Sequence, residues 1–185
     1  MPQHNSPPPM MRLWLLHNRH GRMTSDQWLI LVTEPLLPII LLIIPVLAVA
    51  AHPAGRLLWR AGGVARWLLP VLALAVLVML LLRARRYAGM ALQQAVFYGQ
   101  NPAPFAQRWR RKTTLLNTLG HPFSFDNIAT PSITLSPDAA YLVYYLEERS
   151  RRVLLSLAPL EHEDAEQWQP SEQFLQRQAK RLRRT

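Results

Sequence analysis

The sequence predicts a membrane protein that consists of a two-helix transmembrane hairpin, a small α+β cytosolic domain and a basic C-terminal helix. Two apolar blocks cover residues 28–51 and 65–82, and about 20 such residues are what a helix needs to cross a hydrocarbon core of about 30 Å. Short runs rich in Tyr, Val, Ile and Leu follow in the last third of the chain, and cations gather at its C-terminal end. The blocks predict the hairpin, the short runs predict strands, and the cations mark the basic helix.

Composition supports an uneven distribution of apolar residues. Half of the 185 residues are hydrophobic, yet the mean hydropathy is only +0.01. The net charge is +10, from 21 Lys and Arg against 11 Asp and Glu, and this balance suits anionic lipid headgroups, nucleic acid or acidic partners. The chain has no Cys, which excludes disulfides, thiolate catalysis and clusters held by Cys.

We divide the chain into four segments. Residues 1–24 form an N-terminal segment with a Pro-rich, disordered tip and a short interfacial helix that places Trp14 at the headgroup level. Residues 25–86 hold the transmembrane hairpin, and residues 87–160 form the cytosolic α+β domain. Residues 161–185 form an acidic linker and a basic amphipathic tail.

The first apolar block begins with a helix-capping signal and contains one carboxylate. Thr24, Ser25 and Asp26 provide side-chain acceptors for the free amides of a helix start. Glu34 is the single ionisable residue inside either block, which makes it a candidate membrane polar site. In an antiparallel hairpin Arg83 lies beside it, so we expect an ion pair between the two side chains. The alternative is a transport role for Glu34, although transporters normally use more polar groups and more spans.

The distribution of arginines predicts the orientation of the hairpin. More of them flank the outer ends of the two blocks than occupy the connection at residues 52–66. By the positive-inside rule, a multi-pass protein of the cell (inner) membrane with both termini in the cytoplasm is expected. A rival topology makes the Pro-rich first block a re-entrant segment that never crosses.

The cytosolic domain is expected to contain one helix and a small sheet. We expect the second membrane helix to continue as a stalk to Gly99. Asn101 and the prolines after it favour a helix over residues 101–119. Three short runs then predict a three-stranded antiparallel meander at residues 132–135, 141–146 and 153–157.

Basic side chains of the helix at residues 101–119 and of the tail are the candidate contacts with anionic headgroups or with a protein partner. They are Arg108, Arg110, Arg111, Lys112, Lys180, Arg181, Arg183 and Arg184. For the helix, an equal alternative is that its aromatic stripe packs on the core of the domain while the cations form its solvated face.

No pattern in the sequence predicts catalysis or a cofactor. His17 with His20, and His162 among acidic residues, have spacings that metals use, but we expect little order in these segments and therefore no metal site. Gly-rich phosphate loops, nucleophile elbows and paired carboxylates are not found. We expect no enzyme activity, no cofactor and no small-molecule substrate.

The predicted function follows from this organisation. We expect a non-catalytic membrane-anchored protein that holds a small basic domain at the membrane surface for partner binding, as an accessory subunit or a scaffold. The expected partners are a bilayer with anionic headgroups and a protein or larger membrane complex. Nucleic acid is the weakest candidate, because Phe174 is the only aromatic residue of the tail. The alternative function is a component of an oligomeric transporter or channel that uses Glu34.

Overall fold

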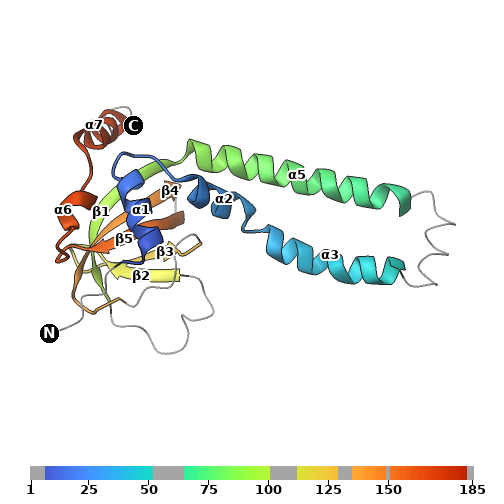
Figure 1. Cartoon of the computed structure of the whole chain (residues 1–185), viewed down its shortest axis with the longest axis horizontal. Helices are drawn as coiled ribbons and strands as arrows, with labels where there is room; N and C mark the ends of the chain where they lie inside the picture. Colours follow the sequence, from blue (N-terminus) through green and yellow to red (C-terminus); the bar gives the residue numbers. More distant parts are fainter. Residues whose placement is uncertain (1–6, 52–64, 101–111, 129–134, 149–150, 183–185) are drawn as a thin grey trace. The chain divides into compact units, whose positions relative to one another are not determined.

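The computed structural model describes residues 7–51, 65–100, 112–128, 135–148 and 151–182 (Figure 1). The chain divides into two compact units. One consists of Met1–Trp28 together with Met90–Thr185, and the other is Leu29–Gly89. The second unit is therefore an insertion in the sequence of the first.

The larger unit is built on a closed β-barrel with the strand order β1-β2-β3-β5-β4 (Figure 1). Because β4 returns to pair with β1, the first four strands form a Greek key, and β5 closes the barrel between β3 and β4. Five-stranded Greek-key barrels include the OB-fold, an architecture that supports many unrelated functions. The strands are β1 Ala91–Gly99, β2 Lys112–Leu116, β3 Pro122–Asp126, β4 Ala140–Glu148 and β5 Arg151–Pro159.

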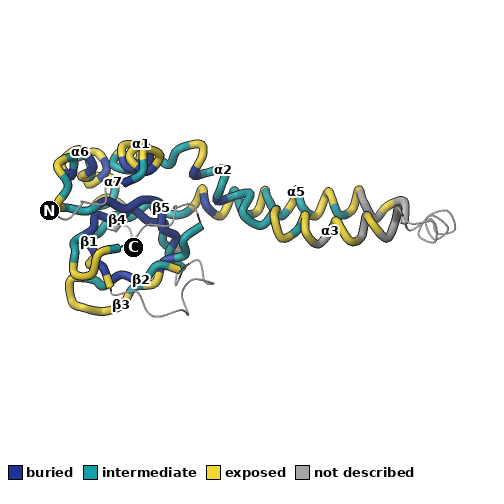
Figure 2. The backbone as a smooth tube through the Cα atoms, turned by 60° about the horizontal axis from the view of Figure 1, so that its bottom comes forward, coloured by how far each residue is buried: buried dark blue, intermediate teal, exposed yellow. Residues whose placement is uncertain are grey.

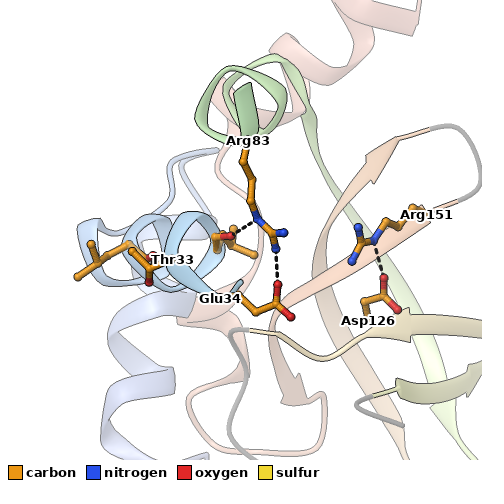
Figure 3. A network of polar contacts seen from close by, with 7 residues as sticks. Thr33, Glu34, Arg83, Asp126 and Arg151 are labelled. Carbon is orange, nitrogen blue, oxygen red and sulfur yellow. Dashed lines mark hydrogen bonds and ion pairs between the residues drawn. The ribbon is translucent and has the colours of Figure 1, made fainter. Parts of the chain in front are cut away.

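Side chains reinforce the barrel where its backbone pairing is shortest. The parallel pair β3 and β5 has one register position, Asp126 opposite Val153. Arg151 donates from Nε to Oδ2 of Asp126 at 2.6 Å, which joins the same two strands (Figure 3). Beside this pair, the guanidinium carbon of Arg152 lies 4.3 Å from the centre of the Phe123 ring. These contacts close the seam between β3 and β5 with charge and cation–π attraction as well as backbone pairing.

The inside of the barrel is filled by aromatic rings that meet edge to face. Phe97 lies 5.1 Å from Phe125, and Phe125 lies 5.4 Å from Tyr145, both measured between ring centroids. All three side chains are buried. Edge-to-face contacts add to the free energy of burial because the positive ring edge meets the negative face.

Three helices belong to the barrel unit: α1 Pro9–Asn18, α6 Ala165–Trp168 and α7 Glu172–Leu182. Helix α1 packs on β5, and its Met11 and Leu15 belong to the same buried cluster as the barrel residues (Figure 2). Trp14 is also buried. The prediction that Trp14 lies at the headgroup level is therefore wrong, because the apolar face of this helix packs on the protein's own core.

The inserted unit contains the apolar helices. Helix α2, Ser25–Thr33, begins in the barrel unit and continues into the insertion, where α3, Leu36–Ala51, and α5, Ala65–Gly89, follow. A turn at Glu34 and Pro35 separates α2 from α3. Most of the large side chains described on α3 and α5 are exposed (Figure 2).

The predicted two-helix transmembrane hairpin is wrong. Among the described residues, one helical stretch, Ser25–Pro45, is long and apolar enough to cross a membrane. The second predicted span lies in α5, where Arg66 and Arg83 leave an uncharged stretch at residues 67–82. No second stretch among the described residues meets this measure. The fold is α+β: a closed five-stranded barrel with helices.

Two expectations for the region after α5 are also wrong. The predicted stalk helix to Gly99 ends at Gly89, and β1 follows it. Val96, Phe97 and Tyr98 are strong strand formers, and pairing with β4 decides the outcome. Within the predicted helix at residues 101–119, residues 112–116 form β2; residues 101–111 lie outside the described part of the chain.

The predicted three-stranded meander is part of a larger sheet. Its second and third runs, residues 141–146 and 153–157, lie in β4 and β5, which pair antiparallel. For the first run, residues 132–134 lie outside the described part, and Leu135 is in no strand. β1, β2 and β3 complete the barrel instead. The expected acidic linker after β5 contains α6, whose Trp168 is buried.

A close backbone approach makes Gly99 a test of the barrel. A Cβ atom at Gly99 would lie 2.0 Å from the carbonyl oxygen of Ser136, whereas one at Gly89 has no neighbour within 4 Å. We expect Gly99→Ala to lower the free energy of unfolding by about 1–3 kcal/mol, the usual cost of overpacking. Denaturant unfolding followed by near-UV circular dichroism measures this change. The matched control, Gly89→Ala, is expected to unfold like the native chain, and equal effects of both changes would contradict the predicted clash.

Candidate functional site

The apolar helix begins at a reciprocal cap formed by Thr24 and Gln27. The backbone N–H of Gln27 donates to Oγ1 of Thr24 at 3.2 Å, and the N–H of Thr24 donates to Oε1 of Gln27 at 3.1 Å. This is a capping box, which satisfies two amides that the helix cannot use itself. The predicted cap by Thr24 is confirmed, and Gln27 completes it.

The same glutamine attaches the helix start to the barrel. The Gln27 side chain is fully buried, and its Nε2 donates to the carbonyl oxygen of Leu155 on β5 at 3.1 Å. One residue further along β5, Oγ of Ser156 accepts from Nδ2 of Asn18 at 2.7 Å, and Asn18 is the last residue of α1. Adjacent residues of β5 thus hold both ends of the connection from α1 to α2.

A further buried hydrogen bond attaches the end of α6 to the barrel. The hydroxyl of Tyr144 on β4 donates to the carbonyl oxygen of Trp168 at the end of α6, at 2.7 Å. Burial raises the pKa of the Tyr144 hydroxyl, an effect that Arg19 partly offsets. The phenol therefore stays neutral at physiological pH and keeps its proton for this bond.

Glu34 and Arg83 are brought together inside the inserted unit. Nη2 of Arg83 lies 2.6 Å from Oε2 of Glu34, and Nε of Arg83 donates to the carbonyl oxygen of Leu31 at 2.8 Å (Figure 3). The same guanidinium stands over the Tyr87 ring, 5.4 Å from its centroid. Arg83 thereby joins α5 to the end of α2, and its guanidinium group balances the charge of the Glu34 carboxylate.

Apolar side chains dominate the exposed surface of the inserted unit. Within Ser25–Pro45, only 6% of the most apolar 18-residue segment is buried. Exposed apolar surface on this scale marks contact with lipid or with another protein. The exposed large side chains of α3 and α5 are Leu37, Ile40, Leu41, Ile44, Trp67, Val71, Leu74, Leu77, Val78, Leu81 and Leu82.

The predicted basic contacts are only partly described. Lys112 begins β2 and Lys180 lies in α7, and both side chains are exposed. Arg181 is a residue of α7 whose side chain is not described. The remaining five lie outside the described part of the chain: Arg108, Arg110, Arg111, Arg183 and Arg184.

Sequence reasoning missed several residues of this region. The T-x-x-Q spacing of Thr24 and Gln27 was the available signal for the capping box. No pattern in the neighbouring sequence predicts the hydrogen bonds of Asn18 and Gln27 to β5, because their partners lie more than a hundred residues away. Within the described residues, no group of three or more His, Asp or Glu side chains lies close enough to hold a metal ion.

Comparisons with known proteins add no family. No protein-family model, no curated protein and no solved structure matches this chain.

The Gln27 side chain is expected to set the stability of the helix start. Gln27→Ala removes one capping hydrogen bond and leaves the buried Leu155 carbonyl without this donor, at a cost of about 1–3 kcal/mol. Ser25→Ala, at the exposed neighbouring position, is the matched control. Denaturant unfolding measures both changes, and hydrogen exchange at residues 24–28 locates the effect. Equal exchange in the two variants would rule out the predicted role of Gln27.

The Glu34–Arg83 pair is expected to couple energetically. We predict a favourable coupling energy of about 0.5–1.5 kcal/mol between Glu34→Gln and Arg83→Gln, at the lower end of the usual range because both side chains are partly exposed. A double-mutant cycle of unfolding free energies measures it. Arg85→Gln, at an exposed arginine in the same helix, is expected to show no coupling to Glu34→Gln. A zero coupling for the pair would contradict the contact.

Proposed function

We propose that the chain is a non-catalytic membrane-anchored protein that holds its basic barrel at the membrane surface for partner binding. The observation that carries this proposal is the apolar helical stretch Ser25–Pro45, with mean hydropathy 2.2 and 6% burial. Its first turn is hydrogen-bonded to the barrel through Gln27. A helix that is apolar around its surface and unburied within its own chain needs a lipid or protein environment.

The order of the two units along the chain constrains how the membrane is entered. Residues on both sides of the insertion, up to Trp28 and from Met90, belong to the barrel unit. The chain must therefore enter and leave the bilayer on the same face. We infer a re-entrant insertion from the cytoplasmic side of the cell membrane, with Arg12, Arg19 and Arg22 before the apolar stretch supporting this orientation.

The partners follow from charge and exposed surface. A net charge of +10 favours a bilayer with anionic headgroups, and the exposed apolar side chains of α3 and α5 suit a membrane-embedded protein partner as well as lipid. An accessory subunit or scaffold fits this combination. The pairing of Glu34 with Arg83 speaks against the alternative of a transport site, because it occupies the carboxylate that such a site needs.

A single lysine in the apolar stretch tests the anchor. Leu41 on α3 is 61% exposed and Leu119 in a turn of the barrel unit is 77% exposed. If α3 enters lipid, Leu41→Lys costs about 2.5–3.5 kcal/mol at the membrane centre, which reduces membrane partitioning more than about tenfold. Flotation with vesicles of phosphatidylcholine and phosphatidylglycerol measures the bound fraction.

The control variant Leu119→Lys is expected to float like the native chain. If Leu41→Lys floats as well as the native chain, insertion of α3 is contradicted. If both variants lose flotation equally, the loss is a general effect of the added charge, and insertion of α3 is not supported. An expression test in cells with carbonate extraction of membranes repeats the comparison in the native environment.

A further inference from the structure

A basic hollow lies in the barrel unit between the end of α1, the turn after it and α7. Its volume is about 360 Å³, within the size range of small-ligand sites. Its lining consists of two arginines, two histidines and one glutamine, and contains no carboxylate. These residues are His17, His20, Arg22, Gln173 and Arg177.

The walls of the hollow are fixed by packing and by backbone hydrogen bonds. Gly21 has φ +72°, and a Cβ atom there would lie 2.7 Å from the Phe174 ring of α7. The N–H of Ser171, just before α7, donates to the carbonyl oxygen of Arg19 at 2.9 Å. Since Phe174 is buried, the turn that carries His20 and directly follows α1 is held against the first turn of α7.

The lining suits a phosphate group. Guanidinium groups bind phosphate oxygens through paired, charge-assisted hydrogen bonds, and Arg22 and Arg177 supply one from each side of the hollow. The Gln173 amide is a further donor. Nδ1 of His17 contacts the carbonyl oxygen of Leu13 at 3.0 Å, so Nε2 is the nitrogen that remains for a ligand.

The surroundings favour a lipid as the source of that phosphate. Arg22 precedes Ser25, the first residue of the apolar stretch, by three residues, which is at most about 11 Å of extended chain. Helix α1 also exposes Met10, Leu13 and Leu16, at intervals of three residues. An apolar stripe next to cations is the pattern of a surface that lies in the headgroup region.

We propose that the hollow between α1 and α7 binds the phosphate of an anionic phospholipid headgroup. This inference rests on the proposed membrane anchoring, and it names the lipid contact of the barrel itself. Arg22 and Arg177 hold the phosphate oxygens, while the exposed side chains of α1 contact the adjoining acyl region.

Lipid titration of the full chain in neutral detergent tests the site without requiring membrane insertion. The probes are dioctanoyl phosphatidic acid, dioctanoyl phosphatidylcholine and inorganic phosphate at constant ionic strength, and native mass spectrometry with the thermal midpoint reports binding. We expect saturable binding of phosphatidic acid, at least about tenfold tighter than that of phosphatidylcholine. The phosphomonoester offers the two guanidinium groups a further anionic oxygen, and it lacks the choline cation that they repel.

Variants separate a defined site from general charge. Arg22→Ala with Arg177→Ala is expected to weaken phosphatidic acid binding more than about tenfold. Arg22→Lys with Arg177→Lys keeps both charges and is expected to retain only part of the affinity, since lysine lacks the paired donors. Arg85→Ala with Arg86→Ala removes the same charge from exposed positions of α5, outside the hollow, and is expected to leave affinity unchanged.

Three outcomes of the lipid titration would contradict a phospholipid site in the hollow. Equal losses in the alanine pair and the control pair mean non-specific attraction, and no saturable binding means no site. Equal affinity for inorganic phosphate and phosphatidic acid assigns the hollow to a free phosphate and removes the lipid. Because these measurements are made in detergent, they fail or succeed independently of the flotation of Leu41→Lys.

Discussion

The hydrogen bond from the buried Gln27 side chain to the carbonyl oxygen of Leu155 is the constraint on which the organisation of this chain depends. Gln27 belongs to the capping box that starts the apolar helix and, at the same time, to the packed surface of β5. A buried amide without partners is costly, so the helix start and the strand must keep this geometry together. The start of α2 is consequently fixed on the barrel.

The barrel can support this fixed point because its own closure is reinforced. Only one residue pair joins β3 to β5, and the ion pair between Asp126 and Arg151 spans the same strands. β5 is also the strand that receives Asn18 and Gln27. β5 has one register position with β3 on one edge and eight with β4 on the other, where the pairing is irregular between Tyr144 and Tyr145. Helix α1 packs on this strand.

Patterns of neighbouring residues predicted the local structure of this chain. They did not predict which strands and side chains pair across long distances in the sequence. The cap at Thr24, the tail helix and the runs that became β4 and β5 could be read directly, because each depends on neighbouring residues. The contact of Glu34 with Arg83 was expected, although from a hairpin that proved wrong. Trp14 was expected at the membrane surface but is buried in the protein, since periodicity alone does not distinguish lipid from a protein core. The Greek key and the basic hollow depend on partners distant in sequence.

The division of the barrel unit into two stretches of sequence has a consequence for biosynthesis. Met11 and Leu15 belong to the same core as strands that begin only at Ala91. The hydrogen-bond partner of Asn18 is Ser156, which is synthesised 138 residues later. In a growing chain, the apolar insertion is therefore synthesised before the strand on which α1 packs. Under the proposed anchoring, the insertion can therefore meet lipid before the barrel has folded.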